Sequence, residues 1–298
     1  MGNAEQLMIS AFTKAFNKYL YDKCVIGKLA HTEFKDNIKK GMEVDILMPA
    51  TVTLFDYTGG NLPAAEEAAN SLAKIRIDKG KGFNFYIDEI KKQEIEMAPD
   101  LDQKVALAKE YTNDAIEQFA AAVDAAYGEL YPNAGHQVED TNHAAITLSA
   151  SNIKDILAIM QTKFQRGDGK GHNNWVDGQM YAIVPPEFQF FLNKMEDLKY
   201  VESGHKSMEK GFIGRLSGWN ILVSNNIYKD ADGNYYPLFG QKGKTLAGGV
   251  QKKLNVKSYE PDENFNTCFK GFGLYGVGAP RADKLGYAKI SATPTIGA

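Results

Sequence analysis

Length, composition and charge describe an ordinary globular chain. Its 298 residues are 44% hydrophobic and 24% charged, which suffices for one large domain, or two joined ones, with a sizeable core. The formal net charge is -3, and four residues account for all the arginine: Arg76, Arg166, Arg215 and Arg281. Arginine is the usual contact to phosphates and base edges, so this composition argues against a protein that reads nucleic acid.

Cysteine content and hydropathy exclude two further classes of protein. Cys24 and Cys268 are too few for a disulfide framework, and we expect reduced, partly buried thiols. No apolar run approaches the roughly 20 residues of a membrane span. The stretch from Met1 to Gln6 lacks the basic start and apolar segment of a secretory signal, so we expect assembly in the cytoplasm of whichever cell makes the protein.

The N-terminal region predicts a helix followed by an arm. Apolar residues between positions 6 and 21 recur at intervals of three and four, which is typical of one face of an amphipathic helix. They are Met8, Phe12, Ala15, Phe16, Tyr19 and Leu20. A mixed polar stretch with Gly27 and Gly41 follows, and it reads as an arm leading into the first strand.

Alternating apolar residues from Val44 onward indicate a strand. The pattern continues past Pro49 to Leu54, and the internal proline favours an edge strand or a bulge. Residues 57–63 form a glycine-containing turn, and residues 64–73 are either a short helix or an extended return. Alternation resumes over residues 74–87. We therefore predict a long two-way excursion over residues 44–87, with few residues able to form a core of its own.

The strongest helical pattern runs from Leu101 to Leu130. Pro99 and Asp100 precede it and Pro132 ends it. A helix of that length is about 45 Å long. The predicted apolar face is narrow and rich in alanine, which suits a helix lying flat on a sheet. Its members are Leu101, Val105, Ala108, Ala115, Phe119, Ala122, Ala126 and Leu130.

A second region with its own elements begins near Ala144. Asn152 and Asp155 resemble a capping box ahead of a helix. A strand is predicted at residues 180–184, a helix opening at Pro185–Pro186, and a strand–turn–strand unit at 211–223. Asp232–Gly233 reads as a hairpin turn, and strands are predicted at 254–259 and 267–277.

Two short motifs resemble ligand loops but lack required residues. Gly243-Lys244-Thr245 looks like the end of a phosphate loop, yet Leu238 stands where that loop needs a glycine. The acidic stretch from Asp230 to Asn234 looks like a calcium loop, but its glycine is at the fourth position and Gln241 occupies the twelfth. An ordinary Asp-Gly turn accounts for the second motif better.

Histidine and nucleophile patterns also fail to indicate catalysis. The five histidines show no metal-ligand spacing, and the pair His136 and His143 flanks Glu139 and Asp140 in what we read as a solvated polar loop. There is no GxSxG elbow, and neither cysteine has a histidine nearby in sequence. The tripeptide Arg166-Gly167-Asp168 reads as a surface turn. We therefore predict no catalytic, cofactor-binding or metal site and no enzymatic activity.

Four stretches in sequence order resemble the major capsid proteins of tailed bacteriophages with the Hong Kong 97-type fold. Residues 41–90 are similar to the family's extended loop and the strand leaving it, and residues 101–130 to its spine helix. The stretches MYAIVPPEFQFFLNK and GFIGRLSGWNILVSNNI are similar to its axial domain. The stretch NFNTCFKGFGLYGVGAPRADKL is similar to the strand that returns to the peripheral domain.

The resemblance implies an α+β chain with an N-terminal arm, an extended two-stranded loop, a peripheral domain and an axial domain. The arm would span residues 1–40, and the extended loop with its flanking strands 41–88. Residues 89–140 would form the peripheral domain with the spine helix, and 141–249 the axial domain. Residues 250–298 would supply the return strands of the peripheral domain and the C-terminal tail.

The implied function is structural. Subunits of this family assemble as hexamers and pentamers into an icosahedral shell around double-stranded DNA, so the expected location is the virion. The arm and the extended loop would lie across neighbouring subunits. The apolar residues Val52, Leu54, Phe83 and Phe85 would then find their partners on other subunits, which would also cover open strand edges.

The resemblance also implies partners and leaves a rival open. Family members work with portal and sometimes decoration proteins, and many begin with a scaffolding region; here the arm starts at Met1, so we expect a separate scaffolding protein. Some relatives cross-link a loop lysine to an asparagine. Lys74, Lys79 and Lys81 with Asn264 or Asn266 match that pattern only loosely. The alternatives are an encapsulin-type nanocompartment shell with the same fold, and a small-molecule enzyme.

Overall fold

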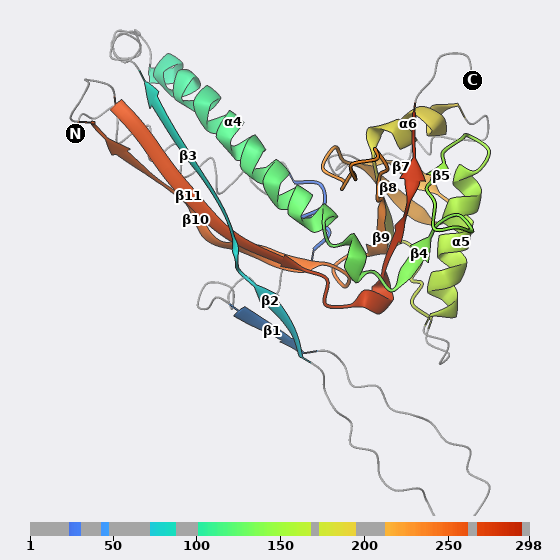
Figure 1. Ribbon diagram of the computed structural model, residues 1–298. Coiled ribbons are helices and arrows are strands. Elements are labelled where there is room, and N and C mark those ends of the chain that lie inside the picture. Colours follow the sequence, from blue (N-terminus) through green and yellow to red (C-terminus); the bar gives the residue numbers. More distant parts are fainter. Residues whose placement is uncertain are drawn as a thin grey trace, which may run out of the picture.

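The computed structural model describes residues 24–30, 43–47, 72–87, 101–167, 173–194, 212–261 and 267–293. The predicted N-terminal helix over residues 6–21 and the predicted turn at residues 57–63 lie outside these ranges. Within them, no helix combines the length and apolarity needed to cross a bilayer. The described elements form two lobes that meet at the C-terminal end of the long helix α4 (Figure 1).

The first lobe is a long helix lying along a three-stranded antiparallel sheet. The sheet has the order β10-β11-β3, with bounds Ala247–Tyr259, Thr267–Gly278 and Lys79–Ile87. Helix α4 runs from Leu101 to Gly128 and follows the sheet for much of its length (Figure 1). The predicted long helix, its position on a sheet and the two late strands are therefore confirmed.

The buried stripe of α4 differs from the predicted one. Ile116, Val123 and Tyr127 face the core, while Ala115 and Ala122 are only partly buried. Phe119 and Ala126 were predicted correctly. The prediction followed the alanines, and alanine's small side chain tolerates either face of a helix. The larger side chains bury more apolar area, so they determine the rotation of the helix about its axis.

The second lobe contains a mixed six-stranded sheet with the order β4-β12-β9-β6-β8-β7. Pairs β6–β8 and β4–β12 are parallel, and the other neighbours are antiparallel. The bounds are His136–Val138 for β4, Met180–Val184 for β6, Phe212–Leu216 for β7, Trp219–Val223 for β8, Leu238–Gln241 for β9 and Leu285–Ala288 for β12.

Strand β6 is buried along its whole length because both faces of this sheet are covered. Met180, Ala182 and Val184 join the core beneath α5 and α6. Tyr181 and Ile183 point the other way and join the core shared with α4. Successive strand residues alternate between faces, so a continuous apolar run is expected for a strand covered on both sides.

Helices α5 (Ile153–Arg166) and α6 (Pro186–Asn193) cover the side of the sheet away from α4 (Figure 1). Both helices were predicted, but the capping box at Asn152 is wrong. The Asn152 side chain accepts a bond from Ser149 N at 2.9 Å and donates to Thr147 O at 2.8 Å, and it makes no cap bond to its own helix. These bonds tie Asn152 to the preceding turn, a competing role common for asparagine.

Short elements complete the second lobe. Strands β5 (Ile146–Thr147) and β13 (Ile290–Ser291) pair in parallel. Two short 3-10 helices, Tyr131–Asn133 and Ala282–Lys284, precede β4 and β12 respectively. Residues 267–291 thus contribute β11 to the first lobe and β12 and β13 to the second.

Strands β1 (Glu43–Leu47) and β2 (Leu72–Arg76) form a two-stranded antiparallel ribbon, as the two-way excursion predicts. One side of the ribbon packs on the three-stranded sheet: Val44 and Ile77 contact Leu274, and Ile46 and Ile75 contact Ala247. The predicted continuation of β1 to Leu54 lies outside the described residues. The base of the excursion is therefore anchored on its own subunit.

Phe83 and Phe85 correct one expectation about this region. They were expected to find partners on other subunits, but both pack against the core shared by α4 and the three-stranded sheet. The Phe85 ring stacks on Phe269 of β11 at 5.6 Å between centroids. Because β3 pairs with β11, which comes almost 200 residues later, these contacts cannot be read from neighbouring sequence. Val52 and Leu54 lie outside the described residues.

Tyrosine rings fill the junction between the two lobes. Tyr131, which follows α4, lies 4.2 Å from Tyr236, 4.9 Å from Tyr228 and 5.5 Å from Tyr287, measured between ring centroids. These distances are typical of aromatic pairs, which contribute beyond their buried area. The rings come from three separate parts of the chain, so they connect the end of α4 to the second lobe.

Candidate functional site

The phosphate-loop-like motif is a tight turn between β9 and β10. Gly243 has a φ of 70°. Thr245 is fully buried, and its hydroxyl oxygen accepts a bond from Gln241 N at 2.8 Å and lies 3.0 Å from the carbonyl oxygens of Gln241 and Lys284. The threonine thus closes its own turn. With its hydroxyl held inside the protein, it is not presented to a phosphate.

The calcium-like motif is likewise a turn that uses its own acidic residue. Asp230 accepts bonds from Asn234 N at 2.7 Å and Asn234 Nδ2 at 3.0 Å, and the Tyr236 hydroxyl donates to it at 3.0 Å. Burial works against ionisation, but these bonds outweigh it and hold the pKa of Asp230 below its usual range. The prediction of a plain Asp-Gly turn is confirmed.

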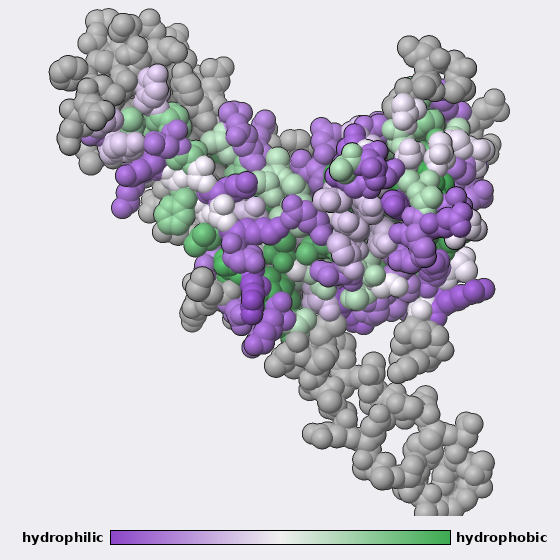
Figure 2. All heavy atoms as spheres, viewed as in Figure 1, coloured by the Kyte–Doolittle hydropathy of each residue, from purple (hydrophilic) through white to green (hydrophobic). Residues whose placement is uncertain are grey.

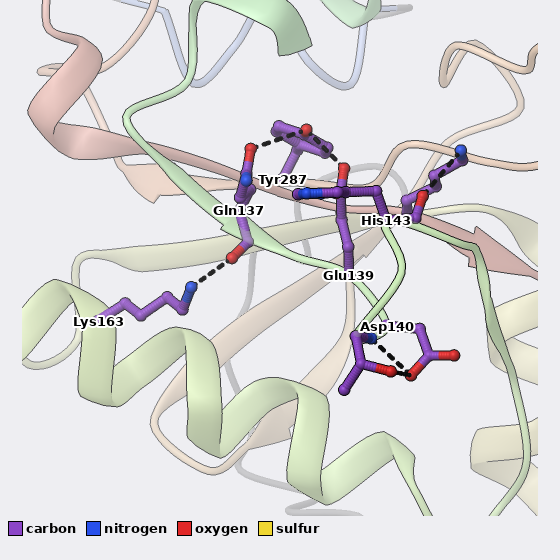
Figure 3. A network of polar contacts seen from close by, with 8 residues as sticks. Gln137, Glu139, Asp140, His143, Lys163 and Tyr287 are labelled. Carbon is purple, nitrogen blue, oxygen red and sulfur yellow. Dashed lines mark hydrogen bonds and ion pairs between the residues drawn. The ribbon is translucent and has the colours of Figure 1, made fainter.

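The loop around His143 forms a polar network (Figure 3). Glu139 lies at its centre, 2.8 Å from His143 Nδ1, and accepts a 2.7 Å bond from the Tyr287 hydroxyl. Lys163 of α5 donates to Gln137 O at 2.6 Å. Burial works against ionisation, but the bonds from Tyr287 and His143 hold the pKa of Glu139 below its ordinary value. Burial and the bond to Glu139 raise the pKa of Tyr287 to about 12.

This network stabilises the loop and does not resemble a catalytic site. The His143 side chain is 81% exposed, and its backbone takes a φ of 57°, which is uncommon outside glycine. His136 lies elsewhere, with its Nε2 2.9 Å from Asp283 O. Among the described residues, no group of three His, Cys, Asp or Glu side chains is placed to hold a metal ion.

The remaining candidate residues are dispersed. Cys24 and Cys268 are both free thiols, as predicted, but both are buried and not partly buried. Arg166 ends α5 and Gly167 follows it, while Asp168 lies outside the described residues. Of the candidate cross-linking lysines, Lys79 pairs with Glu129 at 2.6 Å and Lys74 lies 3.7 Å from Glu43. Asn264 and Asn266 also lie outside the described residues.

A groove of about 700 Å³ runs between β3 and α4. Phe83, Phe85 and Phe119 give it an apolar wall, and Asp114 and Gln118 add polar atoms on the helix side. Figure 2 shows some hydrophobic side chains along this band, and more of them lower on the same face, near the ribbon of β1 and β2. The sequence alternation over residues 83–87 identified the strand, but not that α4 would lie beside it.

Sequence reasoning also missed Asp124. This carboxylate is 1% exposed, on the flank of α4. It accepts backbone bonds from Val25 at 2.7 Å and from Gly27 at 2.9 Å. Its only sequence signal is an acidic residue inside an otherwise apolar stretch, AAAVDAAY, because its partners lie about a hundred positions away.

Comparison with solved structures finds likeness over most of the chain. A structure of Mycobacterium phage Che8 has a TM-score of 0.65 at 18% identity and covers 89% of this chain and 90% of that one. The capsid of cyanophage P-SCSP1u has a TM-score of 0.63 at 13% identity and covers 91% and 89%. A virus-like particle from Pyrococcus furiosus has a TM-score of 0.54 at 14% identity and covers 95% and 98%.

The sequence itself matches no protein-family model and no curated protein. The structural likenesses show the fold, which is α+β and of the Hong Kong 97 type found in phage capsid proteins. The four-segment resemblance in the sequence is confirmed at this level.

Proposed function

We propose that this chain is the major capsid protein of a tailed phage and has a structural, non-enzymatic role. Its subunits assemble as hexamers and pentamers into an icosahedral shell that encloses double-stranded DNA. One observation carries the proposal: the likeness to phage capsid structures extends over about nine-tenths of this chain and of each neighbour.

The proposed division follows the sequence. The arm spans residues 1–40, the extended loop with its flanking strands 41–88, the peripheral domain 89–140 with 250–298, and the axial domain 141–249. Strands β4 and β12 belong to the six-stranded sheet of the second lobe, so the peripheral and axial domains share that sheet. The axial domain faces the capsomer centre. The loop and the parts of the arm outside residues 24–30 lie across neighbours, because residues 24–30 pack in the core of their own subunit.

The proposed partners are other copies of the chain, a separate scaffolding protein and a portal protein. The packaged DNA is contacted weakly and without sequence preference, since the net charge is -3. Assembly takes place in the host cytoplasm, and the protein's final location is the virion. No cofactor, metal or catalytic residue takes part.

A second candidate is the shell of a cellular nanocompartment of the encapsulin type. The virus-like particle from Pyrococcus furiosus favours it, because the match covers 95% of this chain and 98% of that one. The contents of the shell distinguish the two functions. A phage head holds DNA delivered through a portal, whereas a nanocompartment holds protein cargo.

Light scattering on the purified protein tests the proposal. Light scattering should show pentamers, hexamers or closed shells, alone or with a scaffolding protein. Separate activity assays should detect no hydrolase, transferase or redox activity. A monomer at every concentration, with or without a scaffolding protein, contradicts a shell function. Shells that enclose a protein cargo when produced in their natural host, and no DNA, favour the nanocompartment.

A further inference from the structure

The segment from Cys24 to Ala30, here called the strap, joins the two lobes across the flank of α4. Cys24, Ile26 and Leu29 are at most 1% exposed and belong to the core that contains Ile116 and Ala120 of α4. At its far end, Leu29 O accepts a bond from Gly243 N at 2.8 Å, in the turn between β9 and β10.

The near end of the strap is held by one buried carboxylate. Val25 N donates to Asp124 Oδ2 at 2.7 Å and Gly27 N to Oδ1 at 2.9 Å. Both carboxylate oxygens therefore bond to the strap, whose successive N–H groups form a small anion-binding concavity. Among the charged side chains whose burial the structure describes, Asp124 is the one that is fully buried.

Hydrogen bonds from the strap offset the free-energy cost of burying the Asp124 carboxylate. Burial raises the pKa of Asp124, while the backbone bonds from residues 25–27 and a bond from Asn226 act in the opposite direction. A buried carboxylate without such donors is costly, so the carboxylate and the strap depend on each other. Apolar packing alone would also bury Ile26 and Leu29, but it would not fix the position of the backbone, since hydrophobic contacts are non-directional.

We propose that Asp124 is the catch of this strap, that is, the group that holds it against α4, and that the closed strap fixes the point from which residues 1–23 of the N-terminal arm leave the subunit during shell assembly. The assembly part rests on the proposed capsid function; the catch itself does not. Residues 1–23 precede Cys24, so the position of Cys24 against Ala120 sets where that segment starts. An open strap would move this starting point and leave the arm unable to reach neighbours in register.

Cys24 is a built-in reporter of the strap. Its thiol is 1% exposed and lies 3.8 Å from Ala120 O, so a maleimide reaches it only when the strap opens. The experiment uses full-length protein carrying Cys268→Ser, and compares Asp124→Asn with Asp114→Asn. Asp114 is an exposed carboxylate on the same helix, bonded to Gln118 Nε2 at 2.9 Å. Its substitution removes the same charge without touching the strap.

Asp124→Asn places an NH2 group against backbone donors, and we expect maleimide labelling of Cys24 to rise about tenfold or more. Asp114→Asn should label at the parental rate. Val25→Pro removes a donor from the strap's side and should reproduce the rise. Fluorescence of Trp175 and Trp219, both in the core beneath α5 and α6, and the helical circular dichroism signal should be unchanged in all variants. Equal labelling in Asp124→Asn and Asp114→Asn would overturn the catch.

Shell yield tests the second half of the proposal. The parental protein and Asp114→Asn should form shells, while Asp124→Asn and Val25→Pro should lose them at least about tenfold, in proportion to strap opening. Normal shells from a variant with an accessible Cys24 would overturn the link to assembly. If the parental protein forms no shells at all, the capsid function fails, while the labelling comparison still decides whether Asp124 holds the strap.

Discussion

At the scale of single residues, two glycines in turns allow the cost of backbone strain to be distinguished from the cost of steric overlap. Gly218, between β7 and β8, has a φ of 80°, and Gly243, between β9 and β10, a φ of 70°. A Cβ on Gly218 would come within 2.7 Å of the Trp175 ring, whereas a Cβ on Gly243 would meet nothing within 4 Å. The two sites thus share a backbone conformation and differ in available space.

Alanine substitutions should therefore differ in cost. Gly243→Ala should lower the free energy of unfolding by about 1 kcal/mol, the cost of a left-handed conformation for a residue with a Cβ. Gly218→Ala should lose a further 1–3 kcal/mol, roughly, because the Trp175 side chain is packed in a core that cannot yield freely. Chemical denaturation of the two variants measures the difference. Equal losses would mean that the Trp175 ring moves aside without penalty.

Glu139 should make the free energy of unfolding decrease as the pH falls. The pKa of Glu139 lies below its ordinary value of 4.5. Because the pKa is lower in the folded state, the stabilisation is complete above the pKa of the unfolded state. It is lost as the pH falls through the pKa of the folded state. Wild-type protein should therefore lose stability below about pH 4.5 more steeply than Glu139→Gln does.

The measurement is the urea midpoint at several pH values between roughly 6 and 3. Asp140→Asn is the matched control, since Asp140 is an exposed neighbour whose side chain bonds only to adjacent Thr141 among the described contacts. It should keep the acid slope of the wild type. An identical slope in Glu139→Gln would show that the bonds from Tyr287 and His143 contribute nothing to stability.

At the scale of elements, local patterns predicted which helices and strands exist, but not how they face one another. The long helix, the turn at Asp232–Gly233 and the strand–turn–strand unit at β7 and β8 follow from periodicity and turn residues. The rotation of α4 did not, because Ala115 and Ala122 compete with Ile116 and Val123 for the core. The role of Asn152 also failed, because a nearby turn takes its hydrogen bonds.

The candidate site features were less predictable because each depends on contacts between distant positions. Asp124 meets residues 97 and 99 positions away, and Phe85 meets Phe269. A single sequence carries the alternation of each strand but not its partner. By contrast, the sequence alone showed that Gly243-Lys244-Thr245 departs from a phosphate loop, because Leu238 stands where that loop needs a glycine.

The excursion that contains β1 and β2 has a base that belongs to the subunit fold and a tip that we assign to shell assembly, and the two roles can be tested separately. Its base packs on the three-stranded sheet through Val44, Ile46 and Ile75, so it should survive changes further along the excursion. We predict that replacing residues 58–68 with a short Gly/Ser link leaves the subunit folded and abolishes shells or makes them fragile. The reason is that the tip contacts neighbours in the proposed assembly.

Thermal unfolding of the deletion variant and electron microscopy of its assemblies measure the two effects. The melting temperature of the isolated subunit should change little, because a loss of about 1–2 kcal/mol shifts a chain of this size by only a few degrees. A drop of many degrees would assign the tip to the subunit's own core. Normal shells from the deleted protein would contradict its assembly role.

At the scale of the whole molecule, the order of segments was more informative than any motif. No short motif indicated chemistry, yet the sequence of arm, excursion, long helix, compact region and return strands matched one fold. The comparisons bear this out at the level of fold, with identities of 13% and 18% to two phage structures. At such identities few individual residues are shared, so the arrangement of elements retains what motifs do not.

Overall charge predicts weak contact with DNA. With a net charge of -3 and four arginines, the isolated subunit should bind duplex DNA with micromolar or weaker affinity at physiological salt. Affinity should fall further as salt rises, because few phosphates are neutralised. Fluorescence anisotropy with a short duplex measures this. Nanomolar binding at physiological salt would require a concentrated basic surface that the composition does not suggest.

Cryo-electron microscopy of the purified protein, produced with its scaffolding protein where one is needed, tests the central claim most directly. The account predicts closed icosahedral particles whose hexamers and pentamers are each built from the two-lobed subunit, with the second lobe at the capsomer centre and the tip of the excursion, residues 58–68, reaching a neighbour. Only monomers, or open aggregates without icosahedral symmetry, would contradict it.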